Sequence, residues 1–207
     1  MNRNEVKRIL KLRDELLKMC EKLDKDITGN IENEEVIIIY LHCKSEFENI
    51  ICNINRVLLS YCEEFAVGRW LLQIKGMNEA LAAGLLAYYD VKDKECAAQF
   101  IQYAGVSNNN NPHNVDARKI LDKIVSNMKK EPQSLYANLR YNKYSELLEN
   151  EENSNFTAGL RADRHMLKIF IAHLFEEMYR EEYNGITPKR HDNNEHIYIE
   201  PEVKYTR

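Results

Sequence analysis

Residues 74–90 read IKGMNEALAAGLLAYYD, and two apolar segments with helical periodicity meet within this stretch. The first segment ends at Ile74 and the second begins at Glu79, so only residues 75–78 separate them. So short a turn between two apolar segments predicts a helical hairpin. The chain has only seven glycines and four prolines in 207 residues, which favours long helices over a turn-rich sheet. We therefore expect an all-α protein.

The turn itself allows two interpretations. A helix start leaves backbone N–H groups without intrahelical partners, and together with the helix dipole these groups form an anion site. Gly76 and Asn78 tolerate a left-handed backbone, Lys75 adds a positive charge, and Met77 can turn inward between the helices. These four residues could hold nucleic-acid phosphate without reading bases. In the other interpretation, the turn is an ordinary corner between two helices.

Toward the N-terminus, apolar periodicity predicts helices over residues 3–26, 32–64 and 65–74. The second of these helices carries an apolar series whose steps alternate between four and three residues. Such a heptad seam is typical of coiled coils. The series is Val36, Tyr40, Cys43, Phe47, Ile50, Ile54, Val57 and Tyr61.

This seam has two candidate partners, which are the first helix of the same chain and a second copy of the chain. Several apolar residues lie off the seam and need cover as well, namely Ile37, Ile38, Ile39 and Leu41. A helix that is apolar on more than one stripe must bury more than one side, so we expect a homodimer. The expected oligomer contacts are Val36, Tyr40, Phe47, Ile50, Ile54 and Val57.

Toward the C-terminus, the expected helices cover residues 79–89, 93–103, 116–130, 135–148 and 157–183. Pro188 stops the last helix, and an extended tail follows. The sequence thus divides into a coiled-coil αα-hairpin (residues 1–64), a helical domain containing a helix-hairpin-helix (residues 65–187) and the tail (residues 188–207).

The net charge of −4 argues against a generally basic nucleic-acid coat, but the charge is unevenly distributed. Residues 67–130 contain nine basic and six acidic side chains, whereas acidic side chains predominate on both flanks. On the last long helix, Arg161, Arg164 and Lys168 share one face and could line a phosphate track. The alternative is a solvated face with ion pairs to residues such as Asp163.

The five cysteines include no C-x-x-C pair, and most of them occupy apolar helical positions. We interpret them as reduced thiols of a cytoplasmic protein, and no apolar run is long enough to span a membrane. In the tail, His191, Asp192, Glu195 and His196 are weak metal-ligand candidates, so we expect no metal and no cofactor. No catalytic motif rises above background, and we expect a protein without enzymatic activity.

The stretch WLLQIKGMNEALAAGLLAYYDV and the later AAQFIQYAGV carry a family resemblance. They resemble the C-terminal domain of insertion-sequence transposases of the IS-one-ten group, the bridge-RNA-guided recombinases. The first motif is matched by Ile74, Gly76, Met77, Ala82, Leu86 and Ala87, and the second by Phe100, Tyr103, Ala104 and Gly105. Residues 65–201 more closely resemble phage and prophage proteins that carry this domain alone, in part through Arg164, His165, Lys168 and His173.

Three departures limit what the resemblance implies. Asn78 replaces the second hairpin glycine, the N-terminal part is a coiled coil in place of the nuclease-like domain, and Ser107 lies too close to Gly105 to match the catalytic serine. The resemblance therefore implies DNA association, and is compatible with dimerisation, in a phage or mobile element, without recombination. The alternative is a phage protein-binding module that inhibits or regulates a host defence or nuclease complex.

Overall fold

The computed structural model describes residues 1–29, 33–92, 94–107, 113–149, 154–188 and 201. These residues form eight α-helices and no strand, so the all-α prediction is confirmed. The helices are α1 (Arg3–Thr28), α2 (Glu34–Glu63), α3 (Ala66–Gln73), α4 (Glu79–Tyr88), α5 (Ala97–Tyr103), α6 (Val115–Met128), α7 (Leu135–Glu149) and α8 (Asn155–Glu182). The expected tail, residues 188–207, lies almost wholly outside the described residues, and so do the metal-ligand candidates within it.

Polar N-caps set where most of these helices begin. Asn2 caps α1 in a reciprocal capping box with Glu5, and Asn33, Asn78 and Asn114 cap α2, α4 and α6. An asparagine side chain at the cap accepts a hydrogen bond from a first-turn amide that has no intrahelical partner. In a chain with little glycine and proline, asparagine therefore separates one helix from the next.

One helix boundary differs clearly from its prediction. The sequence predicts a helix from Asp93, but α5 begins at Ala97 after Cys96. The Asp90 carboxylate accepts a hydrogen bond from the Lys92 amide, and the Lys94 amide donates to the Val91 carbonyl. These local turns use the backbone groups that a helix through this segment would need.

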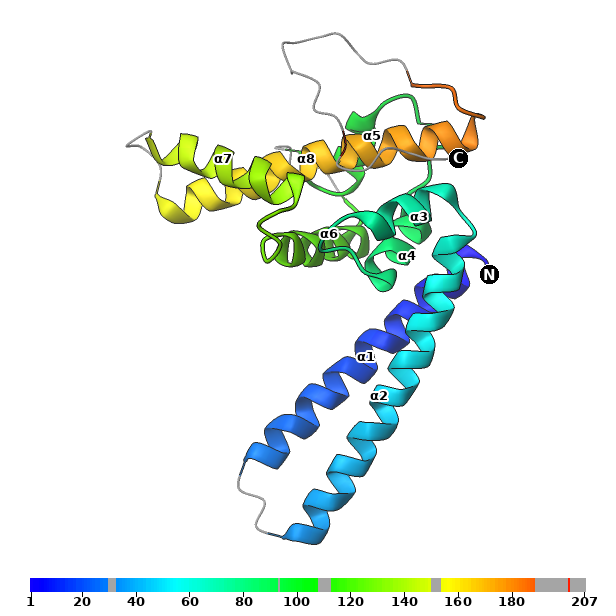
Figure 1. Ribbon diagram of the computed structural model, residues 1–207, viewed down its shortest axis with the longest axis vertical. Helices are drawn as coiled ribbons and strands as arrows, with labels where there is room; N and C mark the ends of the chain where they lie inside the picture. The colour runs from blue at the N-terminus through cyan, green and yellow to red at the C-terminus, as the bar shows by residue number, and fades with distance from the viewer. Residues whose placement is uncertain (30–32, 93, 108–112, 150–153, 189–200, 202–207) are drawn as a thin grey trace.

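The core lies between α4, which is buried all along its length, and α8. Every residue from Ala80 to Ala87 is buried, because α1, α2, α3 and α6 all pack on α4. Above it, α8 packs on α3, α5, α6 and α7 (Figure 1). The largest fully buried side chains include Trp70, Tyr89, Tyr136, Phe100, Phe170 and Phe175.

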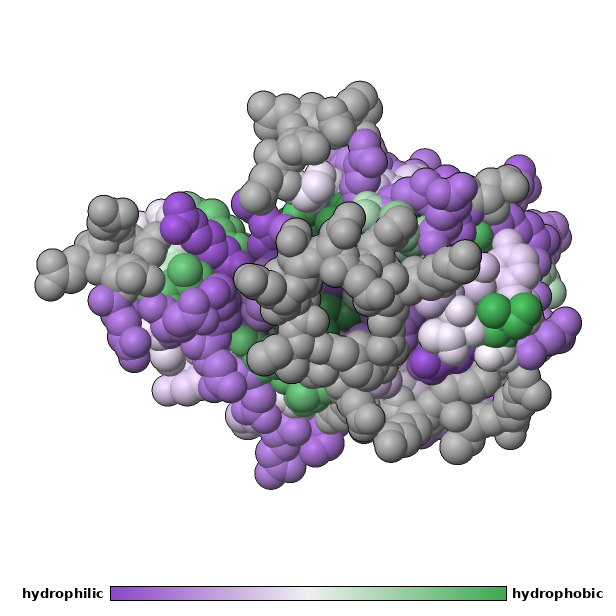
Figure 2. All heavy atoms as spheres, turned by 90° about the horizontal axis from the view of Figure 1, so that it is seen from above, coloured by the Kyte–Doolittle hydropathy of each residue, from purple (hydrophilic) through white to green (hydrophobic). Residues whose placement is uncertain are grey.

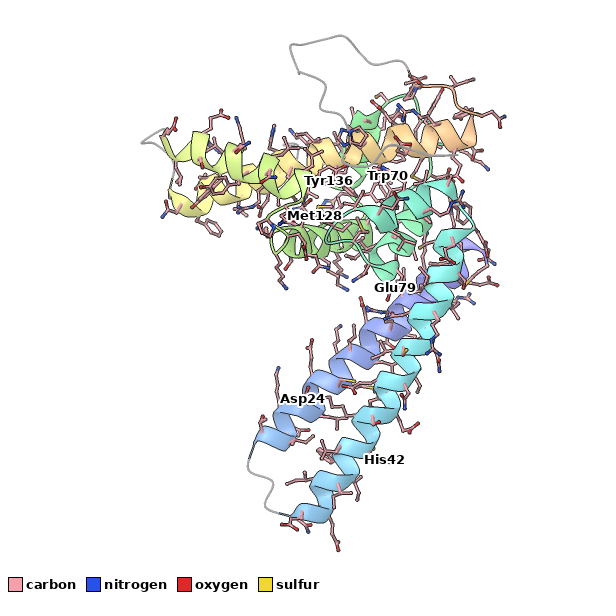
Figure 3. All side chains as sticks on the ribbon, viewed as in Figure 1. Asp24, His42, Trp70, Glu79, Met128 and Tyr136 are labelled. Atoms are coloured by element: carbon pink, nitrogen blue, oxygen red, sulfur yellow. The ribbon has the colours of Figure 1, made fainter. Side chains whose placement is uncertain are left out.

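The N-terminal hairpin of α1 and α2 projects away from this core. Figure 3 shows Asp24 and His42 far along the hairpin from Trp70, with no other element beside them. At its base, however, Val6, Leu58 and Cys62 belong to the same continuous core as the later helices. A domain boundary at residue 64 therefore stays a prediction.

The seam that α2 buries within the chain departs from the predicted heptad at two positions, Ile50 and Val57. Ile51, Ile54, Leu58 and Tyr61 are buried, whereas Ile50 and Val57 are 43% and 48% exposed. Of the other expected oligomer contacts, Val36, Tyr40 and Phe47 are partly buried within the hairpin. The seam takes two consecutive four-residue steps, Cys43 to Phe47 to Ile51, because a straight helix turns once in about 3.6 residues and drifts from a strict heptad.

The apolar residues off the seam remain largely uncovered within one chain. Ile38, Ile39 and Leu41 are 64%, 58% and 51% exposed at the far end of the hairpin. Seen from the opposite end of the molecule, the residues that carry a hydropathy colour are mostly hydrophilic (Figure 2). Among the described residues, no helix is both long enough and apolar enough to cross a membrane.

Candidate nucleic-acid interface

The turn between α3 and α4 has the backbone of a tight corner. Gly76 has a φ of +86°, and the Met77 amide donates to the Ile74 carbonyl at 3.0 Å. Asn78 is extended, with a φ of −131°, so it does not share the left-handed conformation that its residue type allows. Its side chain instead accepts a hydrogen bond from the Leu81 amide at 3.0 Å and caps α4.

The close approach that Gly76 permits is made to this chain's own α6. A Cβ added at Gly76 would lie 3.1 Å from the Met128 Cα and 3.2 Å from the Asn127 carbonyl carbon. The glycine is therefore accounted for by packing of the turn against the end of α6. Lys75 points out of the corner, with its Nζ 3.3 Å from the Gln133 amide oxygen.

The predicted cations on α8 lie on a different surface. Arg161 and Arg164 are exposed and Lys168 is half-buried. Asp163, between the arginines in sequence, binds Lys129 at the end of α6 and Arg140 of α7, each at 2.6 Å. Among the four residues of the turn, only Asn78 lines the groove described next, and none of the three α8 cations does so. The structure thus does not gather the predicted phosphate ligands into one site.

A groove of about 730 Å³ lies between α1, α4 and α6, and it contains the N-terminus of α4. Seven basic and three acidic side chains line it, in a chain whose net charge is −4. Leu10, Leu17 and Leu81 contribute apolar surface to its walls. The basic residues are Lys7, Arg8, Lys11, Arg13, Lys18, Lys119 and Lys123.

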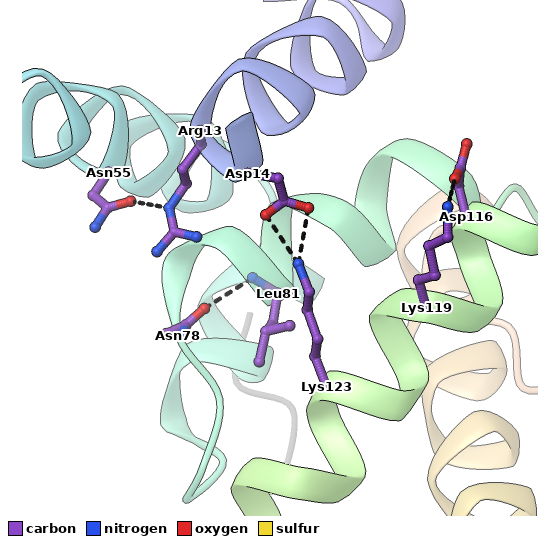
Figure 4. Close-up of polar contacts among 8 residues, drawn as sticks. All are labelled: Arg13, Asp14, Asn55, Asn78, Leu81, Asp116, Lys119 and Lys123. Carbon is purple, nitrogen blue, oxygen red and sulfur yellow. Dashed lines mark hydrogen bonds and ion pairs between the residues drawn. The ribbon is translucent and has the colours of Figure 1, made fainter. Parts of the chain in front are cut away.

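Polar contacts hold several of these side chains in place (Figure 4). The Lys123 Nζ lies 2.9 and 2.8 Å from the two carboxylate oxygens of Asp14, so this pair connects α6 to α1. The Arg13 Nε donates to the Asn55 side-chain oxygen at 2.6 Å, and the Lys119 Nζ lies 3.1 Å from Asp116. Arg8, Lys11 and Lys18 are exposed, so their charges are accessible to a ligand.

The N-terminal end of α1 is fixed against α4 by two further cationic contacts. Lys7 lies over the Tyr88 ring, with its Nζ 4.8 Å from the ring centroid, and Arg3 forms an ion pair with Asp90. Burial raises the pKa of Tyr88, and the charge of Asp116 raises it further. Tyr88 therefore stays neutral and offers Lys7 an aromatic face.

The groove residues of α1 can be recognised in the sequence from the spacing of charged residues, which a search for apolar periodicity does not detect. Lys7, Lys11, Asp14 and Lys18 recur at steps of four, three and four residues, which places them on one face of a helix. On α6, Lys119 and Lys123 follow the same rule. What the spacing does not reveal is that the two basic faces lie opposite each other, so the groove was missed as a site.

His173, one of the residues that carry the family resemblance, is buried on α8. It is 4% exposed, and its Nδ1 lies 2.9 Å from the Tyr136 hydroxyl. Within the described residues, no group of three or more His, Cys, Asp or Glu side chains is placed to hold a metal ion. No family model, curated protein or solved structure matches this chain.

Proposed function

We propose that this protein binds DNA through its phosphate backbone, in the groove between α1, α4 and α6. The observation that supports this most is the concentration of seven basic side chains around one groove of an acidic chain. Lysine and arginine held close together attract a polyanion and displace its counterions, and such binding needs no contact with the bases.

The groove residues have different roles in this proposal. Arg8, Lys11 and Lys18 are exposed on α1 and contact phosphates directly, while Lys119 and Lys123 approach the same strand from α6. Asn78 caps α4 and also lines the groove, so the positive end of the α4 dipole lies at the groove. Lys75 does not line the groove, but it is exposed in the turn before α4 and adds a positive charge there.

The proposed activity is binding alone, with no cleavage or strand exchange. This proposal follows from the sequence, which offers no match to the catalytic carboxylates and serine of the transposases. The resemblance to these transposases implies that such a protein works in a phage or mobile element. Incubation of the protein with supercoiled plasmid and magnesium tests this point, since cleavage would contradict it.

Fluorescence anisotropy of a labelled duplex across a salt series tests the binding. We expect log affinity to fall linearly with log salt, with a slope of about −0.9 for each phosphate neutralised. Three to five contacts would give a slope between about −2.7 and −4.5. Duplexes of unrelated sequence should bind equally, because phosphate contacts carry no sequence information. Absence of binding at low salt would contradict the proposal.

The exposed apolar tip of the hairpin favours a second candidate, a protein-binding module that acts on a host complex. Ile38, Ile39 and Leu41 are more than half exposed. They lie within about one turn of His42, which is far along the hairpin from the other helices (Figure 3). Apolar side chains that gather at an exposed surface mark protein contact sites. Two results together would replace the first function with this second one. The wild type would show no DNA binding, and a host protein would copurify with the wild type but not with the double variant Ile38→Asp, Leu41→Asp.

A further inference from the structure

Four exposed apolar residues form two matched pairs on the α1–α2 hairpin. Leu12 and Met19 of α1 are 47% and 51% exposed, and Ile50 and Val57 of α2 are 43% and 48% exposed. Each pair is seven residues apart, which is two helical turns, so each pair forms a stripe along its helix. These side chains are not part of the seam that holds the hairpin together, because that seam uses Leu16, Cys20, Ile51, Ile54 and Leu58.

Both stripes lie on the side of the hairpin that faces away from the rest of the molecule. On α1, Asp14 binds Lys123 of α6, and Leu12 and Met19 lie about 160° and about 140° around the helix from it. On α2, the Cys62 Sγ donates to the Glu79 carbonyl of α4 at 3.6 Å. Val57 and Ile50 lie about 140° and about 120° from Cys62.

The pairing of the two helices brings the stripes side by side. Two polar contacts fix the antiparallel register, namely Arg13 with Asn55 and Lys44 with Asp24, each at 2.6 Å. In this register Leu12 lies beside Val57, and Met19 lies beside Ile50. The result is one apolar face, hereafter the outer face, with two layers of two side chains.

We propose that the outer face binds the outer face of a second copy of this chain, so that two hairpins form a four-helix bundle. The outer face is as long as α1, about 39 Å, and two helices wide, about 20 Å. Its area is therefore about 800 Å² per copy, which equals the area that each partner buries in a specific interface of standard size. Each layer of one copy packs on a layer of the other copy. The bundle then contains two layers, each made of four apolar side chains.

Charge selects the orientation of the second copy. A twofold axis along the hairpin places α1 on α2 of the second copy, and it brings Lys22 of one copy opposite Glu46 of the other. A twofold axis across the hairpin would instead place α1 on α1 and α2 on α2, so Lys22 and Glu46 would not pair. The inferred dimer therefore has both hairpin tips at the same end, with Leu12 against Val57 of the second copy.

The dimer is independent of the proposed DNA binding, and its first test is the mass of the 207-residue chain in solution. We expect sedimentation equilibrium to show a dimer, and Ile50→Glu to weaken it by about a hundredfold because a charge would be buried without a partner. The matched control is Ile38→Glu on the same helix, which is 64% exposed and lies about 120° around from Ile50. Circular dichroism should show both variants folded.

Two results would overturn the proposal. One is a monomeric wild type at about a hundred micromolar, a concentration at which a specific interface of standard size is formed. The other is dissociation by Ile38→Glu with no effect of Ile50→Glu, which would place the contact on the opposite side of the hairpin. A dimer that forms without DNA binding, or DNA binding by a monomer, separates this inference from the proposed function.

A second experiment tests the orientation. In the proposed bundle, Lys22 lies opposite Glu46 of the second copy. Lys22→Glu and Glu46→Lys should each weaken the homodimer by about fivefold, because each places like charges together. A mixture of the two variants restores opposite charges across the interface and should form mainly heterodimers. A statistical mixture of dimers would instead place the twofold axis across the hairpin.

Discussion

Lys123 of α6 and Asp14 of α1, 109 residues apart in the sequence, both line the basic groove and form an ion pair with each other. The two side chains are 53% and 45% exposed, so solvent screens the pair and it contributes at most about 1 kcal/mol to folding. Asp14 is thus a local competitor for a cation that the proposed function assigns to phosphate.

Replacement of Asp14 by asparagine should therefore strengthen DNA binding. Asp14→Asn removes a negative charge from the groove and frees Lys123, and we expect affinity at low salt to rise about three- to tenfold with a steeper salt slope. The urea midpoint should change little. Anisotropy and urea titration measure the two effects, and weaker DNA binding by a folded Asp14→Asn protein would contradict this role.

Gly76 is predicted to matter for stability. Gly76→Ala places a Cβ 3.1 Å from the Met128 backbone at a φ of +86°, and we expect a loss of about 1–3 kcal/mol in the free energy of unfolding. Gly159→Ala is the matched control, because its Cβ would meet only the end of Arg140 at 3.9 Å in a regular helix. The control should be stabilised by about 0.5–1 kcal/mol.

The same glycine variant distinguishes the two interpretations of the turn. If Gly76 serves only the packing against α6, the folded fraction of Gly76→Ala should bind DNA with the wild-type salt slope. If the turn is itself a phosphate clamp, the slope should become shallower by about 0.9 for each phosphate that the variant no longer neutralises.

Glu177 is predicted to make stability depend on pH. Its side chain is 1% exposed, and burial raises its pKa from 4.5 to about 7, against the opposing charge of Arg180. Within the described residues, its Oε2 has no hydrogen-bond partner. Because the folded state holds this proton more tightly, stability should fall as pH rises from about 4.5 to about 7, by at most about 3 kcal/mol.

Glu177→Gln tests this dependence, since glutamine has a similar shape and does not titrate. Urea midpoints at pH 5 and pH 7.5 should differ less in the variant than in the wild type. The control is Glu182→Gln on the same helix, at an exposed position, which should leave the wild-type dependence intact. An unchanged pH dependence in Glu177→Gln would show that other groups cause it.

The helices were predictable because their cues are local. Apolar periodicity located all eight, and Asn78 and Asn114 lie at starts expected within one residue. The seam of α2 was predicted only in part, because a strict heptad places Ile50 and Val57 inward where the structure buries Ile51 and Leu58. The start of α5 was missed because short-range hydrogen bonds of Asp90 compete with the helix.

Only those features of the candidate site that depend on residues close together in the sequence were predictable. The capping position of Asn78 belongs to the turn and was singled out from the sequence, although for a different backbone conformation. The groove was not, because it depends on α1 and α6 meeting around α4, and no spacing along the chain encodes the contact between Asp14 and Lys123. The buried environment of Gly76 has the same origin, since the residues that cover it come from the end of α6.

The most direct test of the proposed function compares two pairs of lysines on α1. Lys11 and Lys18 line the groove, while Lys22 and Lys25 lie further along the same helix and outside it. In a salt series with labelled duplex DNA, Lys11→Gln with Lys18→Gln should make the slope of log affinity against log salt shallower by about 1.8. Lys22→Gln with Lys25→Gln should leave that slope unchanged. Equal effects of both pairs, or none from the first, would show that the groove is not where this protein holds phosphate.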